Sequence, residues 1–274
     1  MAWEALKAIA RWEAVGLRFT MPQPWRQLVP WSHSCKILSG ATVNARKRID
    51  QLLAASFLLR VAKGVVLLFF YRINDSLVVG APWWRFLLSR ARRGILVKTG
   101  RAFPPSHPTT KMCLRLMVRN LRERRCRNLV DVGCGSGILA LAGLRLGAEL
   151  AVALDISTQA LVTSRANAEL NSLKEGLLLV RGSAEAVSGR FDLVLANLPM
   201  PTLTENLAEL VRLSGDEASL VLSGFQDVDK YLLQEKINAL GLTAEYWLSE
   251  DLTFFAVPPS GSFTWMALLA RRRV

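Results

Sequence analysis

Three glycines spaced two residues apart form the segment of this chain most suggestive of chemistry. Gly133, Gly135 and Gly137 follow the mostly apolar residues 129–132, which predicts a buried strand, a tight turn and then a helix. Glycines let the backbone approach a bound molecule closely, and the free N–H groups at a helix start favour polar ligands. The pattern indicates a nucleotide site, and by itself it fits a dinucleotide equally well.

Asp155 ends the next apolar run, Ala151–Leu154, about 20 residues after the glycines, where nucleotide-binding folds place an acid. A carboxylate at this point accepts hydrogen bonds from both ribose hydroxyls. We expect Ile156 and Ser183 to contact the same ligand. The alternative is that Asp155 only places a negative charge at the start of a helix, where the helix dipole stabilises it.

A second acid, Asp131, lies within the strand that precedes the glycines. A buried carboxylate needs partners, so Asp131 either orients the turn or meets a positive charge on the ligand. An acid at this position is unusual in dinucleotide folds and common where the ligand carries a cationic amino acid. The glycines and the two acids together predict S-adenosylmethionine as the cofactor.

Residues Asn197-Leu198-Pro199-Met200 follow a fourth apolar strand, Phe191–Ala196. Reactive side chains gather at the carboxyl ends of strands in open α/β sheets, so Asn197 and Pro199 are the candidate catalytic residues. The Asn197 amide oxygen can accept a hydrogen bond from a nucleophilic amine or from the cofactor, and Pro199 stiffens the loop. The alternative is that Asn197 caps the following turn.

Such a site suits transfer of a methyl group from a sulfonium. This displacement depends on placing the nucleophile and excluding water, and it needs little acid–base help. His33 and His107 are the only histidines, and both are distant in sequence from the glycine turn. The four cysteines contain no Cys-x-x-Cys pair, which argues against a structural metal and favours reduced thiols in a cytoplasmic protein.

The elements that position these residues alternate between strand and helix, which indicates a mostly parallel sheet covered on both faces. The last two strand-like segments have no obvious helix between them, so we expect an antiparallel hairpin. The predicted fold is therefore a Rossmann-like α/β domain with a smaller N-terminal region. The predicted strands are 128–132, 150–154, 177–181, 191–196, 218–222, 243–248 and 263–270, and the predicted helices are 109–121, 136–146, 158–171 and one after Thr204.

The first part of the chain shows weaker patterns. We expect an amphipathic helix within residues 1–20, an irregular connection over 21–40 and a helix over 49–61. Strands over 64–73 and 76–80 flank Asn74-Asp75, a turn pair, and 83–93 is a helix or a covered segment. The domain prediction is a basic N-terminal region, 1–94, that recruits the substrate, followed by a cofactor-binding domain, 95–274.

Charge is distributed unevenly along the 274 residues. The chain has a formal net charge of +13, with +19 in residues 1–127, −9 in residues 128–270 and +3 in the tail 271–273. A basic front half favours an anionic partner, with nucleic acid first and a membrane surface second; the alternative is a solvated basic face. The most apolar run, 64–71, is too short to span a membrane, and the N-terminus does not resemble a signal peptide.

Several motifs resemble the bacterial ribosomal protein L11 methyltransferases, over about residues 76–274. They are the segment His107-Pro108-Thr109-Thr110-Lys111-Met112-Cys113-Leu114, the glycine segment VDVGCGSGILALAGLRLGA, LDISTQALVTSRANAELN and FDLVLANL. The resemblance implies a class I methyltransferase sheet with cofactor contacts from Thr110, Gly133, Asp155 and Asn197. It also implies lysine or N-terminal amines as methyl acceptors.

The chain departs from this family at three places. Phe103-Pro104-Pro105-Ser106 replaces a glycine-rich run, and Asn-Leu-Pro-Met leans toward the Asn-Pro-Pro-Tyr loop of enzymes that methylate amide or nucleobase nitrogens. Residues 1–75 show no likeness to the family's recruiting domain. The leading hypothesis is therefore an N-methyltransferase acting on protein amino groups, of the ribosomal-protein type. The alternatives are an RNA or nucleobase N-methyltransferase and an inactive cofactor-binding module.

Overall fold

The computed structural model describes residues 70–73, 77–82, 85, 94–99, 103–252 and 262–272 with their side chains, and the backbone alone of 56–61 and 64–69. The chain divides into two compact units, 1–68 and 69–274. The predictions for 1–40, for the turn at Asn74-Asp75 and for 83–93 apart from Arg85 lie outside the described residues. The predicted domain boundary after residue 94 stays a prediction.

In the first unit, strand β1 (Ser56–Val61) lies next to the first part of β2 (Gly64–Ile73) in one sheet. The helix predicted over 49–61 is therefore wrong for its second half, while 49–55 lie outside the described residues. The apolar run from Phe57 to Leu59 fits both periods, and a short apolar run cannot be assigned by periodicity alone. Pairing with β2 decides in favour of the strand.

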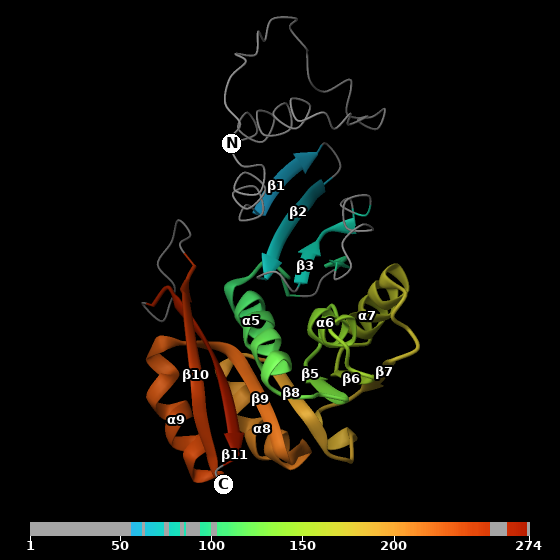
Figure 1. The fold of residues 1–274 in the computed structure, drawn as a ribbon. Coiled ribbons are helices and arrows are strands. Elements are labelled where there is room, and N and C mark those ends of the chain that lie inside the picture. Colours follow the sequence, from blue (N-terminus) through green and yellow to red (C-terminus); the bar gives the residue numbers. More distant parts are fainter. Residues whose placement is uncertain are drawn as a thin grey trace, which may run out of the picture. The chain divides into compact units, whose positions relative to one another are not determined.

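The second unit holds a seven-stranded sheet in the order β10-β11-β9-β8-β5-β6-β7 (Figure 1). The five strands from β9 to β7 are parallel, and β11 is antiparallel to both β9 and β10, which confirms the predicted fold class. The strands are β5 (Asn128–Val132), β6 (Leu150–Asp155), β7 (Leu177–Arg181), β8 (Phe191–Asn197), β9 (Ser214–Gln226), β10 (Leu242–Asp251) and β11 (Thr264–Arg272).

Five α-helices of the second unit are described, and they cover the two faces of this sheet (Figure 1). Residues of β5 show the division, because Val130 packs in the core cluster with Leu203 of α8, whereas Asp131 accepts a hydrogen bond from Ala140 of α6. Alternate residues of a strand point to opposite faces. The helices are α5 (Pro108–Glu123), α6 (Ile138–Arg145), α7 (Thr158–Asn171), α8 (Met200–Leu213) and α9 (Lys230–Ala239), with 3₁₀ turns η2 (Ala184–Ala186) and η3 (Asp227–Asp229).

The end of β2 continues into a small sheet in the second unit. It pairs antiparallel with β3 (Leu77–Gly80), and β3 pairs parallel with β4 (Gly94–Leu96). The strands predicted over 64–73 and 76–80 are thus confirmed. Strand β4 was not predicted, since three residues are too few to show a period.

Two asparagines of α7 pair with the end of β4 and with the residues that follow it. Asn171 accepts from the Leu96 N–H (2.8 Å) and donates to the Leu96 carbonyl (2.6 Å), and Asn167 does the same with Lys98 (2.8 and 2.9 Å). Residues four apart on a helix and two apart on a strand each share a face, so the two spacings match. Asn167 also donates to the Ser136 carbonyl at 2.9 Å, and it therefore links the segment after β4 to the glycine turn.

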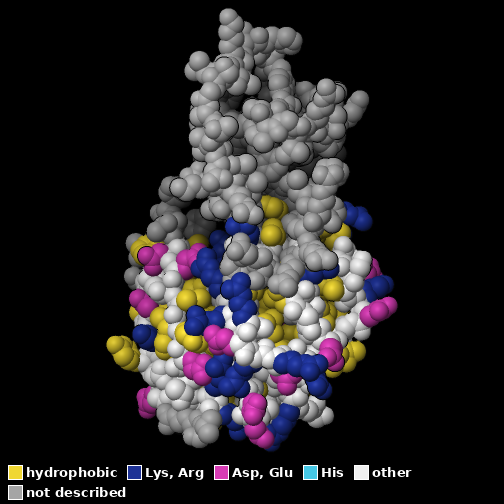
Figure 2. All heavy atoms as spheres, in the orientation of Figure 1, with side chains coloured by type: hydrophobic (Ala, Val, Ile, Leu, Met, Phe, Trp, Pro, Cys, Tyr) yellow, Lys and Arg dark blue, Asp and Glu magenta, His cyan; other side chains and the backbone are white. Residues whose placement is uncertain are grey.

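The charged surface of the second unit is mixed in sign. Figure 2 shows Lys and Arg side chains interspersed with Asp and Glu over its described part. Arg124 donates to the Glu217 carbonyl at 3.0 Å, and Arg125 forms an ion pair with Glu149 at 3.7 Å. In the part of the chain that the structure describes, no helix is long and apolar enough to cross a membrane.

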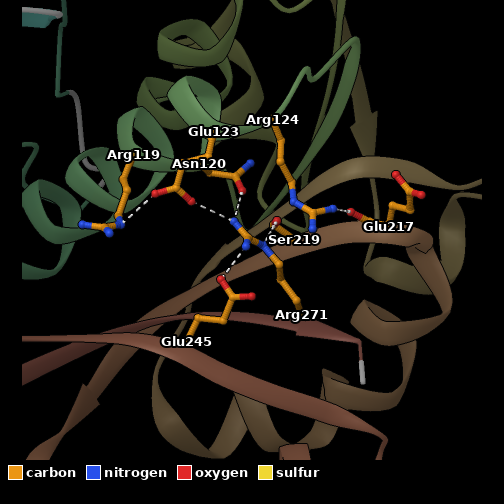
Figure 3. A network of polar contacts seen from close by, with 8 residues as sticks. All are labelled: Arg119, Asn120, Glu123, Arg124, Glu217, Ser219, Glu245 and Arg271. Carbon is orange, nitrogen blue, oxygen red and sulfur yellow. Dashed lines mark hydrogen bonds and ion pairs between the residues drawn. The ribbon is translucent and has the colours of Figure 1, made fainter. Parts of the chain in front are cut away.

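Arg271 of β11 fastens the C-terminal hairpin to the rest of the domain (Figure 3). Its guanidinium forms ion pairs with Glu123 of α5 (3.1 Å) and Glu245 of β10 (2.5 Å), and it donates to Ser219 of β9 (3.1 Å). The same group reaches the buried Asn120 at 3.4 Å. A planar guanidinium presents five N–H donors in a fixed arrangement, whereas an ammonium group has three.

We expect Arg271→Ala to lower the free energy of unfolding by about 2 kcal/mol, because Glu245 and the buried Asn120 and Ser219 lose the guanidinium. Glu123 keeps its ion pair with Arg119 at 3.1 Å. Arg190→Ala is the matched control, since Arg190 forms only an exposed ion pair with Asp216 and should cost about 0.5 kcal/mol or less. Urea unfolding of the two variants measures the difference. Equal midpoints would show that the network contributes nothing.

Candidate active site

A cleft of about 550 Å³ opens at the carboxyl ends of β5 and β6 and beside the loops that follow β7 and β8. Its volume lies within the range of small-molecule sites, about 300–1,000 Å³. It contains five of the residues predicted to bind a cofactor. The lining residues are Phe103, Val132, Gly133, Gly135, Asp155, Ile156, Ser157, Gln159, Ala160, Thr163, Gly182, Ser183, Leu198, Thr202 and Asn206.

The glycine turn presents bare backbone to this cleft. Gly133, Gly135 and Gly137 all have positive φ, at 74°, 54° and 76°, a conformation that favours glycine. A Cβ added at Gly133 would lie 2.3 Å from Cδ2 of Leu198. Gly137 does not line the cleft; a Cβ there would lie 2.9 Å from Oγ of Ser164, so this glycine serves the close packing of α6 against α7.

Asp155 lies in the cleft with its carboxylate oriented by two backbone amides. Oδ2 accepts from the Gly135 N–H at 3.0 Å, and Oδ1 accepts from the Ser157 N–H at 2.8 Å. The start of α7 is capped by Ser157, whose Oγ accepts from the Ala160 N–H at 3.4 Å. A carboxylate has about four acceptor positions, so Asp155 keeps capacity for two ligand hydroxyls. Ile156 beside it is 74% exposed and offers an apolar surface.

Asp131 lies behind the glycine turn and does not line the cleft. Its Oδ2 accepts from the Ala140 N–H of α6 at 3.1 Å. Burial raises the pKa of Asp131 to about 7; the Ala140 amide opposes this rise, and the Asp155 charge adds to it. The carboxyl is therefore ready to ionise when a positive charge comes near.

Asn197 ends β8 next to the glycine turn, because Ala196 pairs with Val132 in the sheet. Its Nδ2 donates to Oγ1 of Thr110 at 3.3 Å, which brings together two of the predicted site residues. This leaves the Asn197 carbonyl oxygen as the atom that can accept from another group. Helix α8 has Pro199 as its N-cap, without a side-chain cap, so Asn197 does not cap it.

His107 is the N-cap of α5 and is not among the residues that line the cleft. Its Nδ1 accepts from the Thr109 N–H at 3.3 Å. Burial and the neighbouring Lys111 lower the pKa of His107 to about 4, so the ring is neutral at physiological pH. His33 lies outside the described residues.

Sequence reasoning missed the residues on which the Asn197 loop rests. The Leu198 N–H donates to the Ser223 carbonyl at 3.0 Å, and Gly224 has a φ of 97°. A Cβ at Gly224 would lie 2.1 Å from the Leu198 carbonyl oxygen. The available signal was a lone glycine within a strand-like run, which marks a close approach of backbone.

These groups fit a nucleoside that carries an ammonium. The cleft offers backbone free of side chains, a carboxylate with remaining acceptor positions and a second, buried acid behind the turn. The fold is the Rossmann-like fold of class I methyltransferases, and its cleft lies at the carboxyl ends of the parallel strands, where such sheets bind ligands. A solved structure of a ribosomal protein L11 methylase from Lactobacillus delbrueckii subsp. bulgaricus has the same fold. It matches with a TM-score of 0.63 and 24% sequence identity, over 75% of this chain and 99% of that chain.

The family model of ribosomal protein L11 methyltransferase (PrmA) matches residues 71–251, and this chain belongs to that family. A ribosomal protein L11 methyltransferase from Chromobacterium violaceum is 34% identical over 206 residues, which are 74% of this chain and 62% of that protein. One from Dechloromonas aromatica is 36% identical over 181 residues, 65% of this chain and 56% of that protein. The chain thus spans about three fifths of the length of these relatives.

Proposed function

We propose that this protein is an S-adenosylmethionine-dependent N-methyltransferase that methylates amino groups of a ribosomal-type protein substrate. The observation that carries the proposal is that two groups of residues lie close together. One is the cleft with the glycine turn and Asp155, and the other is the Asn197–Thr110 pair at the adjacent strand end. Membership of the L11 methyltransferase family supports the choice of a protein substrate.

The proposed roles follow from the chemistry of each group. Asp155 accepts hydrogen bonds from the ribose hydroxyls. Gly133 and Gly135 have no side chain and let the ligand approach the backbone closely. Ile156 and Ser183 line the cleft. Asp131 compensates the ammonium of the ligand. When bound, S-adenosylmethionine supplies a methyl group on a sulfonium.

Asn197 and Pro199 serve the acceptor amine in this proposal. The Asn197 carbonyl oxygen accepts a hydrogen bond from the amine N–H and so aims the nitrogen lone pair. The Thr110 hydroxyl holds the amide in that orientation, and Pro199 starts α8 at a fixed place. Such placement is the main contribution an enzyme makes to this kind of displacement.

The raised pKa of Asp131 predicts a pH dependence of ligand affinity. S-adenosylhomocysteine is the cofactor without its methyl group, and it keeps the ammonium. Its binding therefore favours the ionised form of Asp131. The affinity should rise with pH up to about 7 and level off above. With a pKa of about 7, the dissociation constant at pH 6 should be about eightfold that at pH 7.5. Calorimetric titration measures it. Asp131→Asn should abolish the dependence, and a wild-type affinity that is flat over this range would refute the role of Asp131.

The activity is tested with radiolabelled S-adenosylmethionine and purified bacterial ribosomal protein L11. We expect label on the protein, at lysine or N-terminal amines, and no label after prior chemical blocking of those amines. A protein that binds the cofactor and labels no substrate pool would instead be the inactive cofactor-binding module. The proposal includes a cytoplasmic location, where such a substrate is made.

RNA methylation is the second candidate function, favoured by the charge of +19 in residues 1–127. Basic residues bind phosphates with an affinity that falls steeply as salt rises. On the described face of the second unit, basic and acidic side chains are interspersed (Figure 2). The support for this candidate function is therefore the charge of the sequence and not a basic patch on that face. Label on RNA in the same assay, with salt-sensitive binding, would favour it over the protein substrate.

A further inference from the structure

The Tyr71 hydroxyl forms a hydrogen bond with the segment that enters the cleft. Tyr71 lies at the end of β2 and is 4% exposed, and its hydroxyl donates to the Pro105 carbonyl at 2.7 Å. Pro105 is also buried, so its carbonyl depends on this donor. Burial raises the pKa of Tyr71, which keeps the phenol protonated and able to donate.

The segment 103–107 is restrained at several further points. Each proline fixes its own φ near −65°, and the His107 N–H donates to the Pro104 carbonyl at 3.0 Å. The Phe103 ring lies 4.5 Å from the His107 ring, which in turn meets the Trp265 ring edge-on at 5.0 Å. Phe103 is itself 50% exposed and lines the cleft. These contacts hold an exposed aromatic side chain in one place.

We propose that Tyr71 is a positioning residue that holds the Phe103 wall of the cleft in its ligand-ready position before the ligand binds. The inference rests on the proposed function, because the ligand of this wall is the cofactor nucleoside. If Phe103 is already ordered in the free protein, binding does not have to supply the entropy cost of ordering it, and the affinity is higher. The Tyr71 hydroxyl donates to the Pro105 carbonyl, in the segment that carries Phe103, so we expect Tyr71 to affect binding and to leave the transfer step unchanged.

Tyr71→Phe is the first test, because it removes the hydroxyl and keeps the ring that lies beneath Lys111. We expect the dissociation constant of S-adenosylhomocysteine to rise about fivefold, the usual effect of one hydrogen bond. The KM for S-adenosylmethionine should rise by the same factor, with kcat at saturation unchanged. Hydrogen exchange at the Ser106 and His107 amides should be faster without ligand and return to the wild-type rate with it. Tyr231→Phe, at an 83% exposed tyrosine, is the matched control and should change nothing.

The outcomes separate the inference from the proposed function. Wild-type protein that fails to bind S-adenosylhomocysteine would sink the proposed function. If the wild-type protein binds and the Tyr71→Phe variant has the same affinity and the same exchange rates, the positioning role alone is overturned. This holds even if the melting temperature of the variant falls. If that variant does not fold, the double variant Pro104→Gly/Pro105→Gly decides: it should bind more weakly with faster exchange at Ser106, and an unchanged affinity would overturn the inference.

Discussion

Replacing Asp155 by alanine is expected to weaken the binding of S-adenosylhomocysteine about 100-fold. Two hydrogen bonds from ligand hydroxyls to a charged acceptor are lost, at about 1.5 kcal/mol or more each. The substitution also frees the Gly135 amide that the carboxylate holds at 3.0 Å, which loosens the glycine turn. Calorimetric titration of wild-type and variant protein at the same pH and salt measures the ratio.

Two further variants define what an Asp155 effect means. Asp155→Asn keeps one accepting oxygen and should lose about tenfold, an intermediate value. Asp216→Ala removes an aspartate that is exposed and paired only with Arg190, and it should bind like the wild type. An Asp155→Ala variant that melts at the wild-type temperature and binds with wild-type affinity would remove Asp155 from the site.

Asn197→Ala should lower kcat about 100-fold at saturating cofactor, the usual cost of removing one group that orients the reacting atoms. Affinity for S-adenosylhomocysteine should change by about threefold or less, because Asn197 does not line the cleft and a weakened contact costs under about 1 kcal/mol. Single-turnover methylation of the protein substrate measures the rate, and calorimetry measures the affinity.

Thr110 and Asn238 supply the comparisons for Asn197. Thr110→Val removes the hydroxyl that accepts from Nδ2 at 3.3 Å and should lower kcat by about tenfold, since the amide keeps its place and loses its orientation. Asn238→Ala changes an asparagine of α9 that pairs with Gln234 and should leave kcat alone. A large loss of affinity in Asn197→Ala with kcat intact would assign Asn197 to cofactor binding.

Patterns along the sequence predicted the parallel sheet because each central strand is a short apolar run followed by a helix. They missed α9, since only Leu233 and Ile237 of its ten residues are buried and its apolar period is faint. Helix α8 begins at Met200, before the predicted start after Thr204, because the first turn of a helix accommodates a proline such as Pro201. Strand β4 is too short to show a period and is defined by its neighbours.

The site was predictable where it depends on local backbone and on strand ends. Gly133, Gly135, Asp155, Ile156 and Ser183 all lie in the cleft, although their roles remain predictions. Contacts between distant segments carry no such local signal. The bonds from Asn171 to Leu96 of β4 and from Asn167 to Lys98 join residues 75 and 69 positions apart. The close approach of Gly224 to Leu198 likewise exists only in the folded chain.

The most direct test is calorimetric titration of the folded wild-type protein with S-adenosylhomocysteine at pH 7.5. The account predicts saturable binding of one molecule per chain, in the micromolar range typical of such ligands, on the order of −8 kcal/mol. Binding should be about 100-fold weaker in Asp155→Ala. A wild-type protein that is folded and gives no binding heat at several temperatures would contradict the account.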